Sequence, residues 1–242
     1  MRLMSVAPAV LILLSVTPAN AQEWSEFVSR EDGFKLNVPA APKMTETTYT
    51  SEYGAALPAR VYAVARGEER YSMTVVDYRP IEKLLTEKAK QCPPFADERC
   101  TGLGGGAVVG AGYWRTDVRG ALVWASWQFM QRNAVVTHYM WNFVDLVEGH
   151  QLQLTNRTDR SRTFVAIYMH ANRLYIMEGT VPDGDPEPGL FQQSLGFVDK
   201  DGNGIRYRDY YDNDYPPPPL AGGRGAGPAA GAAGVPAGTG SR

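Results

Sequence analysis

Apolar residues alternate with polar ones, or fill every position, in short runs that are typical of β-strands. Two runs, Thr163–Met169 and Arg173–Val181, are especially rich in β-branched and aromatic residues. The turn-prone triplet His170-Ala171-Asn172 separates them, so the two runs are predicted to form a β-hairpin. Both faces of the first run are mostly apolar, which indicates central strands that are covered on both sides.

Other runs predict further strands before this hairpin. Met44–Thr50 is rich in threonine and is expected at an edge because it is so polar. The remaining strands are bounded by turn-prone segments, and the three between Tyr113 and Asp145 are expected to be successive antiparallel strands. In chain order, the remaining strands are Trp24–Ser29, Phe34–Val38, Ala59–Arg66, Tyr71–Tyr78, Tyr113–Val118, Gly120–Met130, Val135–Asp145 and the segment around Leu152 and Leu154.

Two segments carry helix signals instead. Ile81–Lys90 follows Pro80, is stopped by Pro93-Pro94, and places Leu84, Leu85 and Lys88 on one face. A second helix is expected after the hairpin, with Asp185 as N-cap, Pro186 at the first helical position and Glu187 in the first turn. Its inward stripe would be Leu190, Phe191, Ser194 and Leu195, with Gly196 as the stop.

The order of these elements, strands, helix, strands and helix, predicts an α+β domain with a largely antiparallel sheet and helices packed on it. Residues 23–208 have about the length of one domain. From position 209 the composition changes to an acidic and tyrosine-rich run, then to Pro216–Pro219 and a Pro/Gly/Ala-rich end. Such a segment has little to bury, so 209–242 is expected to be a disordered tail.

The first 21 residues are typical of a secretory signal peptide. Arg2 supplies the positive region, Val10–Val16 lies in a short apolar stretch, and Ala19-Asn20-Ala21 fits the cleavage site. Cleavage after Ala21 is expected, and the alternative is an uncleaved anchor. No later stretch is long enough to span a bilayer, so the chain is expected to be periplasmic or secreted.

The net charge of the chain limits the classes of partner that it is expected to bind. The formal net charge is −2, which argues against a nucleic-acid partner because such a partner requires a basic face.

The two cysteines, Cys92 and Cys100, lie eight positions apart in a chain that we expect to be exported, and they are predicted to form a structural disulfide. Free thiols are the alternative.

The segment Trp24–Pro39, WSEFVSREDGFKLNVP, resembles the opening of PsbP-like domains, where an aromatic strand, an acidic-Gly turn and a short strand ending in proline begin the fold. The closing strand, helix and Leu195-Gly196-Phe197 are similar to the end of such domains. The resemblance implies an α/β/α sandwich with a central, largely antiparallel sheet. The family includes photosystem and nuclear-transport accessory proteins, mostly without enzyme activity. None of its functional residues has a matching motif here, so none is carried over.

Three sets of residues are candidate metal or cofactor sites. His138, His150 and His170 lack metal-ligand spacing and are interpreted as scattered structural or surface residues. Asp199, Asp201 and Asn203 resemble the first half of a calcium loop, but the twelfth position is Tyr210 instead of glutamate, so weak or no binding is expected. The Gly-rich run 102–107 fits a dinucleotide fingerprint only superficially, because no βαβ unit surrounds it. No cofactor is predicted.

Aromatic residues are the most unusual feature of the sequence. Tyr139, Trp141 and Phe143 fall on one face of a predicted strand, and Trp124 and Trp127 fall on opposite faces of another. The favoured interpretation is that they fill the core of an antiparallel sheet. The alternative is a platform for a sugar ring or an apolar ligand.

The sequence shows no motif of a catalytic nucleophile with its base. Ser126 lacks the Gly-flanked elbow of a serine hydrolase, and neither cysteine is a predicted nucleophile. The sequence therefore predicts a non-enzymatic accessory or interaction protein of the bacterial envelope, whose partner is an unknown envelope protein or a small ligand. A periplasmic binder of a small apolar or saccharide ligand is the alternative, and a hydrolase with carboxylates assembled by the fold is the weaker one.

Overall fold

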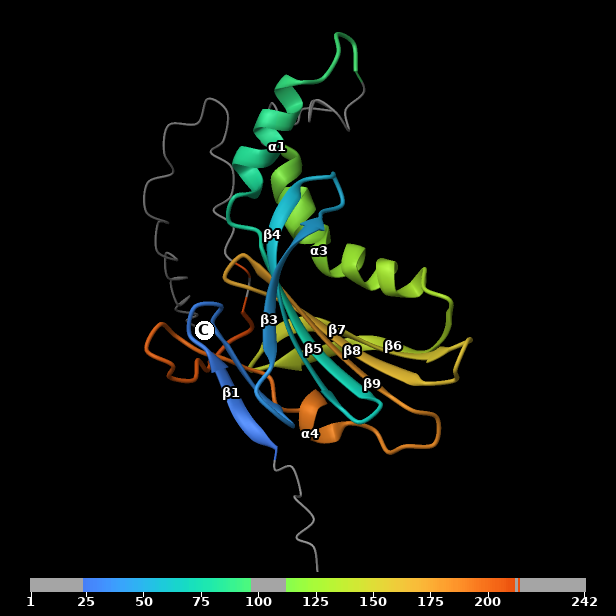
Figure 1. Cartoon of the computed structure of the whole chain (residues 1–242). Coiled ribbons are helices and arrows are strands. Elements are labelled where there is room, and N and C mark those ends of the chain that lie inside the picture. The colour runs from blue at the N-terminus through green and yellow to red at the C-terminus, as the bar shows by residue number, and fades with distance from the viewer. Residues whose placement is uncertain (1–23, 97–111, 212, 214–242) are drawn as a thin grey trace, which may run out of the picture.

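The computed structural model describes residues 24–96, 112–211 and 213 (Figure 1). Seven strands form the main sheet in the order β3-β4-β5-β9-β8-β7-β6, and each neighbouring pair is antiparallel. A smaller sheet has the order β1-β2-β10. The strands are β1 (Ser25–Ser29), β2 (Phe34–Val38), β3 (Lys43–Thr50), β4 (Ala56–Arg66), β5 (Glu69–Asp77), β6 (Ala134–Val144), β7 (Val147–Asn156), β8 (Arg162–His170), β9 (Arg173–Val181) and β10 (Gly196–Phe197).

The predicted central hairpin is confirmed. β8 and β9 pair from Arg162 opposite Val181 to His170 opposite Arg173, and they occupy interior positions of the main sheet. Nearly all their side chains are buried on both faces. A two-residue turn, Ala171-Asn172, joins them with both residues at positive φ, which is the hairpin geometry that matches strand twist.

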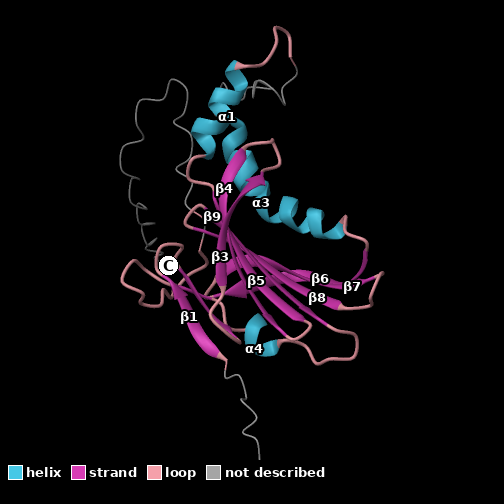
Figure 2. Ribbon diagram, in the orientation of Figure 1, coloured by secondary structure: helices cyan, strands magenta, loops and turns pink. Residues whose placement is uncertain are grey.

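Helices α1 (Ile81–Lys90) and α3 (Gly112–Met130) pack on one face of the main sheet (Figure 2). The core between these helices and the main sheet is a continuous set of apolar side chains from both layers. Its members on the sheet include Leu57, Val76, Leu152, Leu154, Val165, Ile167, Met169, Leu174 and Ile176, and those on the helices are Ile81, Leu85, Val118, Ala121, Ala125 and Phe129. No helix among the described residues has the length and hydropathy needed to cross a bilayer.

The opposite face of the main sheet is covered by the small sheet and by α4 (Gly189–Gln192). A second core fills this layer, and its large rings are Phe34, Tyr62, Tyr71, Tyr168, Tyr175, Phe191 and Phe197. Asp32 in the β1–β2 turn ties the two sheets together, because its carboxylate accepts hydrogen bonds from Tyr62 at 2.6 Å and from Arg60 at 3.0 Å. The α+β class and the central antiparallel sheet are confirmed, and the second covering layer is largely β rather than helical.

One prediction of secondary structure was wrong over a long segment. Tyr113–Val118 and Gly120–Met130 were expected to be two strands, but they form the single helix α3. Its buried apolar residues, Val118, Ala121, Ala125 and Phe129, recur every three or four positions, which is the helical period. Valine and tryptophan favour strands locally, and packing on the sheet overrides that preference.

The helix predicted from Asp185 is also shorter than expected. Helix α4 has four residues and begins after Pro188, because a proline disfavours helical dihedrals at the residue before it. Phe191 and Leu195 are buried as predicted, whereas Leu190 is exposed. Gly196 is not a helix stop, since it lies in strand β10.

Candidate interaction surface

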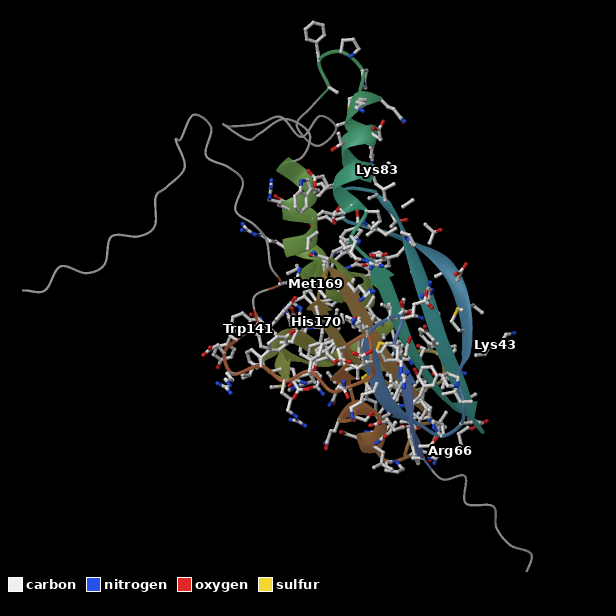
Figure 3. All side chains as sticks on the ribbon, turned by 90° about the vertical axis from the view of Figure 1, so that its left-hand side faces the viewer. Lys43, Arg66, Lys83, Trp141, Met169 and His170 are labelled. Atoms are coloured by element: carbon white, nitrogen blue, oxygen red, sulfur yellow. The ribbon has the colours of Figure 1, made fainter. Side chains whose placement is uncertain are left out.

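The main sheet has two edges, and their side chains differ in charge. Edge strand β3 carries Lys43 and Glu46, as predicted for a strand that must resist pairing with other chains. Edge strand β6 has eleven residues, AVVTHYMWNFV, and none of them is Asp, Glu, Lys or Arg. Figure 3 places Lys43 and Trp141 on opposite sides of the molecule. We call residues 134–144 the β6 edge.

The β6 edge exposes large apolar side chains on both of its faces. The predicted ligand face is exposed: Tyr139 retains 46%, Trp141 67% and Phe143 43% of its accessible surface. The expectation that these rings fill the core was therefore wrong. The reason is topological, since the sheet ends at β6 and α3 packs mainly on β7 and β8. Val135, Val136 and Met140 are exposed as well.

The backbone of β6 is paired on one side. It pairs with β7, and no described strand pairs with its other side. The register shifts between Val136 and His138, so the regular part of the strand is residues 138–144. An edge strand presents alternate N–H and C=O groups that can pair with another chain.

A buried polar group holds the aromatic face in place. His150 on β7 is only 5% exposed, and its Nδ1 lies 2.8 Å from Ser126 Oγ of α3 and 3.1 Å from Tyr139 Oη of β6. Burial lowers the pKa of His150, so the neutral ring is favoured. The Tyr139 and His150 rings meet edge to face at 5.4 Å. This link was not predictable from the sequence, because it joins three elements that are separated along the chain.

A cavity of about 290 Å³ lies beside one end of this face. It is lined by Val118, Arg119, Leu122, Glu148, Met169, Tyr211 and Asn213. Glu148 pairs with Phe143 across the two strands, and the ring of Tyr210 lies 5.5 Å from that of Phe143. Small-ligand sites combine apolar or aromatic surface with a few polar groups, so this cavity and the neighbouring aromatic face are a candidate for one.

The folded domain continues past residue 208, where its end was predicted, and the following residues pack near the cavity. The N–H of Tyr211 donates to Leu146 O at 3.0 Å, and its hydroxyl accepts from the N–H of Ala171 at 2.9 Å. Asn213 Oδ1 accepts from the N–H of Asn172 at 3.0 Å. These bonds stabilise the positive-φ turn of the central hairpin, so the domain extends at least to Asn213. Residues 214–242 of the predicted tail lie outside the described residues.

The three histidines lie in different environments. His138 is exposed on β6, whereas His150 and His170 are buried. His170 stacks on Phe197 at 4.2 Å, and its Nε2 lies 2.6 Å from the Tyr207 hydroxyl. Burial, with a smaller contribution from the positive charge of Arg173, lowers the pKa of His170 to about 4. Among the described residues, no three His, Cys, Asp or Glu side chains cluster as metal ligands would.

The segment that resembles a calcium loop forms a hydrogen-bonded turn. Asp199 Oδ1 accepts from the N–H groups of Asp201 and Asn203, both at 2.9 Å. Asp199 Oδ2 accepts from Asn203 Nδ2 at 3.2 Å. These hydrogen bonds lower the pKa of Asp199. The carboxylate therefore serves as the acceptor of the turn, and weak or absent calcium binding stays a prediction.

Several predicted features lie partly or wholly outside the described residues. The signal peptide, the Gly-rich run 102–107 and Cys100 are among them. Cys92 follows α1 directly, and its disulfide with Cys100 stays a prediction.

The two tryptophans of α3 correct a further expectation. Instead of lying on opposite faces of a strand, the rings of Trp124 and Trp127 stack at 5.0 Å, because residues three apart are neighbours on a helix. Trp124 Nε1 donates to Thr50 O at 3.1 Å, and Trp127 is 47% exposed.

Comparison with solved structures finds a likeness in fold. The fold is similar to the solution structure of cyanobacterial PsbP (CyanoP) from Synechocystis sp. PCC 6803, with a TM-score of 0.40 and 9% sequence identity over 77% of this chain and 99% of that chain. No protein-family model and no curated protein matches the sequence. The resemblance noted in the sequence is to PsbP-like domains as well.

Proposed function

We propose that this chain is a non-enzymatic accessory protein of the bacterial envelope, and that the β6 edge binds an extended protein segment as an added strand. The observation that supports this function is an eleven-residue edge strand without a charged side chain. Natural sheets protect such edges with lysine, proline or a covering element, because an open edge pairs with other chains.

The exposed side chains fit this type of binding. In strand addition, backbone hydrogen bonds supply affinity and pockets for alternate side chains supply specificity. Tyr139, Trp141 and Phe143 alternate on one face of β6, so an added strand would place every second side chain beside an aromatic ring. Aromatic residues are enriched in the centres of protein interfaces.

A second candidate function rests on the 290 Å³ cavity next to Phe143. Glu148, Arg119 and Asn213 could hydrogen-bond a saccharide whose apolar face stacks on an aromatic ring. This function predicts saturable quenching of tryptophan fluorescence by an oligosaccharide, lost in Glu148→Gln.

In-cell photo-cross-linking tests the primary function. A benzophenone amino acid replaces Met140 of the β6 edge, and the matched control replaces Met44 of the charged β3 edge. The two methionines are 46% and 45% exposed, so accessibility does not distinguish them. An adduct with a protein at position 140 and none at position 44 supports the proposal. Equal labelling at both positions, or none at 140, contradicts it.

A further inference from the structure

We propose that the strand bound by the β6 edge is the β6 edge of a second copy of this chain. The two strands would pair antiparallel about a two-fold axis at Trp141 and join two seven-stranded sheets into one. This inference rests on the proposed function and names its partner.

The first argument is the absence of charge from β6. A two-fold contact places the same surface of each copy against the other, so a charged strand brings like charges together. Like charges directly opposite one another destabilise strand pairing. The β6 edge contains no charged residue in eleven, whereas β3, with Lys43 and Glu46, carries charges of both signs.

The second argument is the symmetry of the aromatic residues. The register shift at Val136/His138 leaves residues 138–144 as the regular run, and Trp141 is its middle residue. Pairing about that residue sets Trp141 against Trp141 of the second copy and Tyr139 against Phe143. All three contacts fall on the same face, since residues two apart share a face. Aromatic cross-strand pairs are among those that stabilise antiparallel sheets.

The third argument is that the required surface is open. Tyr139, Trp141 and Phe143 keep between 43% and 67% of their accessible surface, and no described strand covers the outer side of β6. On the other face, Met140 would lie opposite Asn142 of the second copy. Met140 is also exposed, so pairing would cover apolar surface on both sides of the sheet.

A charge-swap experiment tests the proposal by sedimentation velocity of the exported chain. Wild type is expected to form a concentration-dependent dimer. Trp141→Arg and Trp141→Glu, each alone, should raise the dimer dissociation constant at least tenfold, because each places like charges on the axis. An equimolar mixture should recover association as Arg–Glu heterodimers. Met44→Arg on β3 is the matched control and should dimerise as wild type. Circular dichroism verifies that every variant is folded.

The outcomes separate this inference from the proposed function. A wild type that stays monomeric at about 1 mM, a dimer insensitive to both Trp141 variants, or a dimer lost on truncation after Asn213 would overturn the second-copy proposal. A cross-link from position 140 to a different protein would overturn it too, while leaving the proposed function intact. A cross-link between two copies, together with recovery in the mixture, supports it. No adduct from position 140 counts against both.

Discussion

The hydroxyl of Tyr139 lies 3.1 Å from Nδ1 of His150, so the exposed β6 edge is fixed to a buried imidazole. Ser126 approaches the same nitrogen from α3 at 2.8 Å. One histidine thus links the edge strand, its neighbour and the covering helix. This link orients the aromatic face that the proposed binding requires.

Removal of the Tyr139 hydroxyl tests this link. Tyr139→Phe should lower the free energy of unfolding by about 0.5–1.5 kcal/mol, since one hydrogen bond is lost. Urea denaturation measures the change. Tyr210→Phe is the control, because that ring is 74% exposed, and it should change stability by less than about 0.5 kcal/mol. Equal effects of the two variants would contradict a structural role for the Tyr139–His150 contact.

Gly149 on β7 should not tolerate a side chain. A Cβ there would lie 2.3 Å from the backbone oxygen of Ile167 and 2.3 Å from the Tyr168 ring. Gly149→Ala should therefore destabilise the fold by about 1–3 kcal/mol or more through overpacking. At Gly189 a Cβ would meet nothing within 4 Å, so Gly189→Ala should be neutral or slightly stabilising. Thermal melts of the two variants measure the difference. A neutral Gly149→Ala would show that β7 and β8 are not packed as described.

The buried carboxylate of Asp32 should contribute more to the free energy of unfolding than a surface ion pair does. Asp32→Ala removes the acceptor for Tyr62 and Arg60, which is expected to cost about 1–3 kcal/mol because Arg60 and the buried Tyr62 hydroxyl lose a partner. Glu26→Ala breaks the exposed pair with Lys35 and should cost less than about 1 kcal/mol. Similar losses in the two variants would refute the claim that Asp32 joins the two sheets.

Acid should weaken the fold through His170. The folded protein holds the pKa of this ring at about 4, whereas an unfolded chain titrates near its ordinary value of about 6.5. Below that value the unfolded state binds the extra proton, so the free energy of unfolding falls as pH drops from about 6.5 to about 4. Above about pH 6.5, the lowered pKa of His170 contributes about 3 kcal/mol to the free energy of unfolding.

Denaturation at several pH values measures this dependence. His170→Gln should flatten the curve between about pH 6.5 and 4, while His138→Gln, at an exposed histidine, should leave it unchanged. If the free energy of unfolding of His170→Gln depends on pH as steeply as that of wild type, groups other than His170 cause the acid sensitivity.

The parts of the fold that were predictable are those where local pattern and tertiary environment agree. The β8–β9 hairpin, the polar edge strand β3 and helix α1 have residues that suit their final positions. Helix α3 was missed because Val123, Trp124 and Trp127 favour strands, and its helical spacing becomes evident only once Val118, Ala121 and Ala125 are seen on the sheet.

The candidate surface was only half predictable. The alternation of Tyr139, Trp141 and Phe143 identified a shared face, but alternation is the same for an inner strand and for an edge strand. Whether this strand lies inside the sheet or at its edge depends on the order in which the strands pair, and that order was not predictable from the sequence. The absence of charge from residues 134–144 was the available signal for an edge that binds another strand.

Amide hydrogen exchange of the purified chain, resolved for residues 138–144 and followed against protein concentration, tests the central claim most directly. The β6 edge is predicted to be open in the dilute protomer, so its outward amides should exchange much faster than those of Leu152 and Leu154 in β7. They should become protected when the edge is paired, at high concentration or with a cross-linked partner. Amides of β6 that exchange as slowly as those of β7 at every dilution would contradict the account, because the edge would then already be covered within one chain.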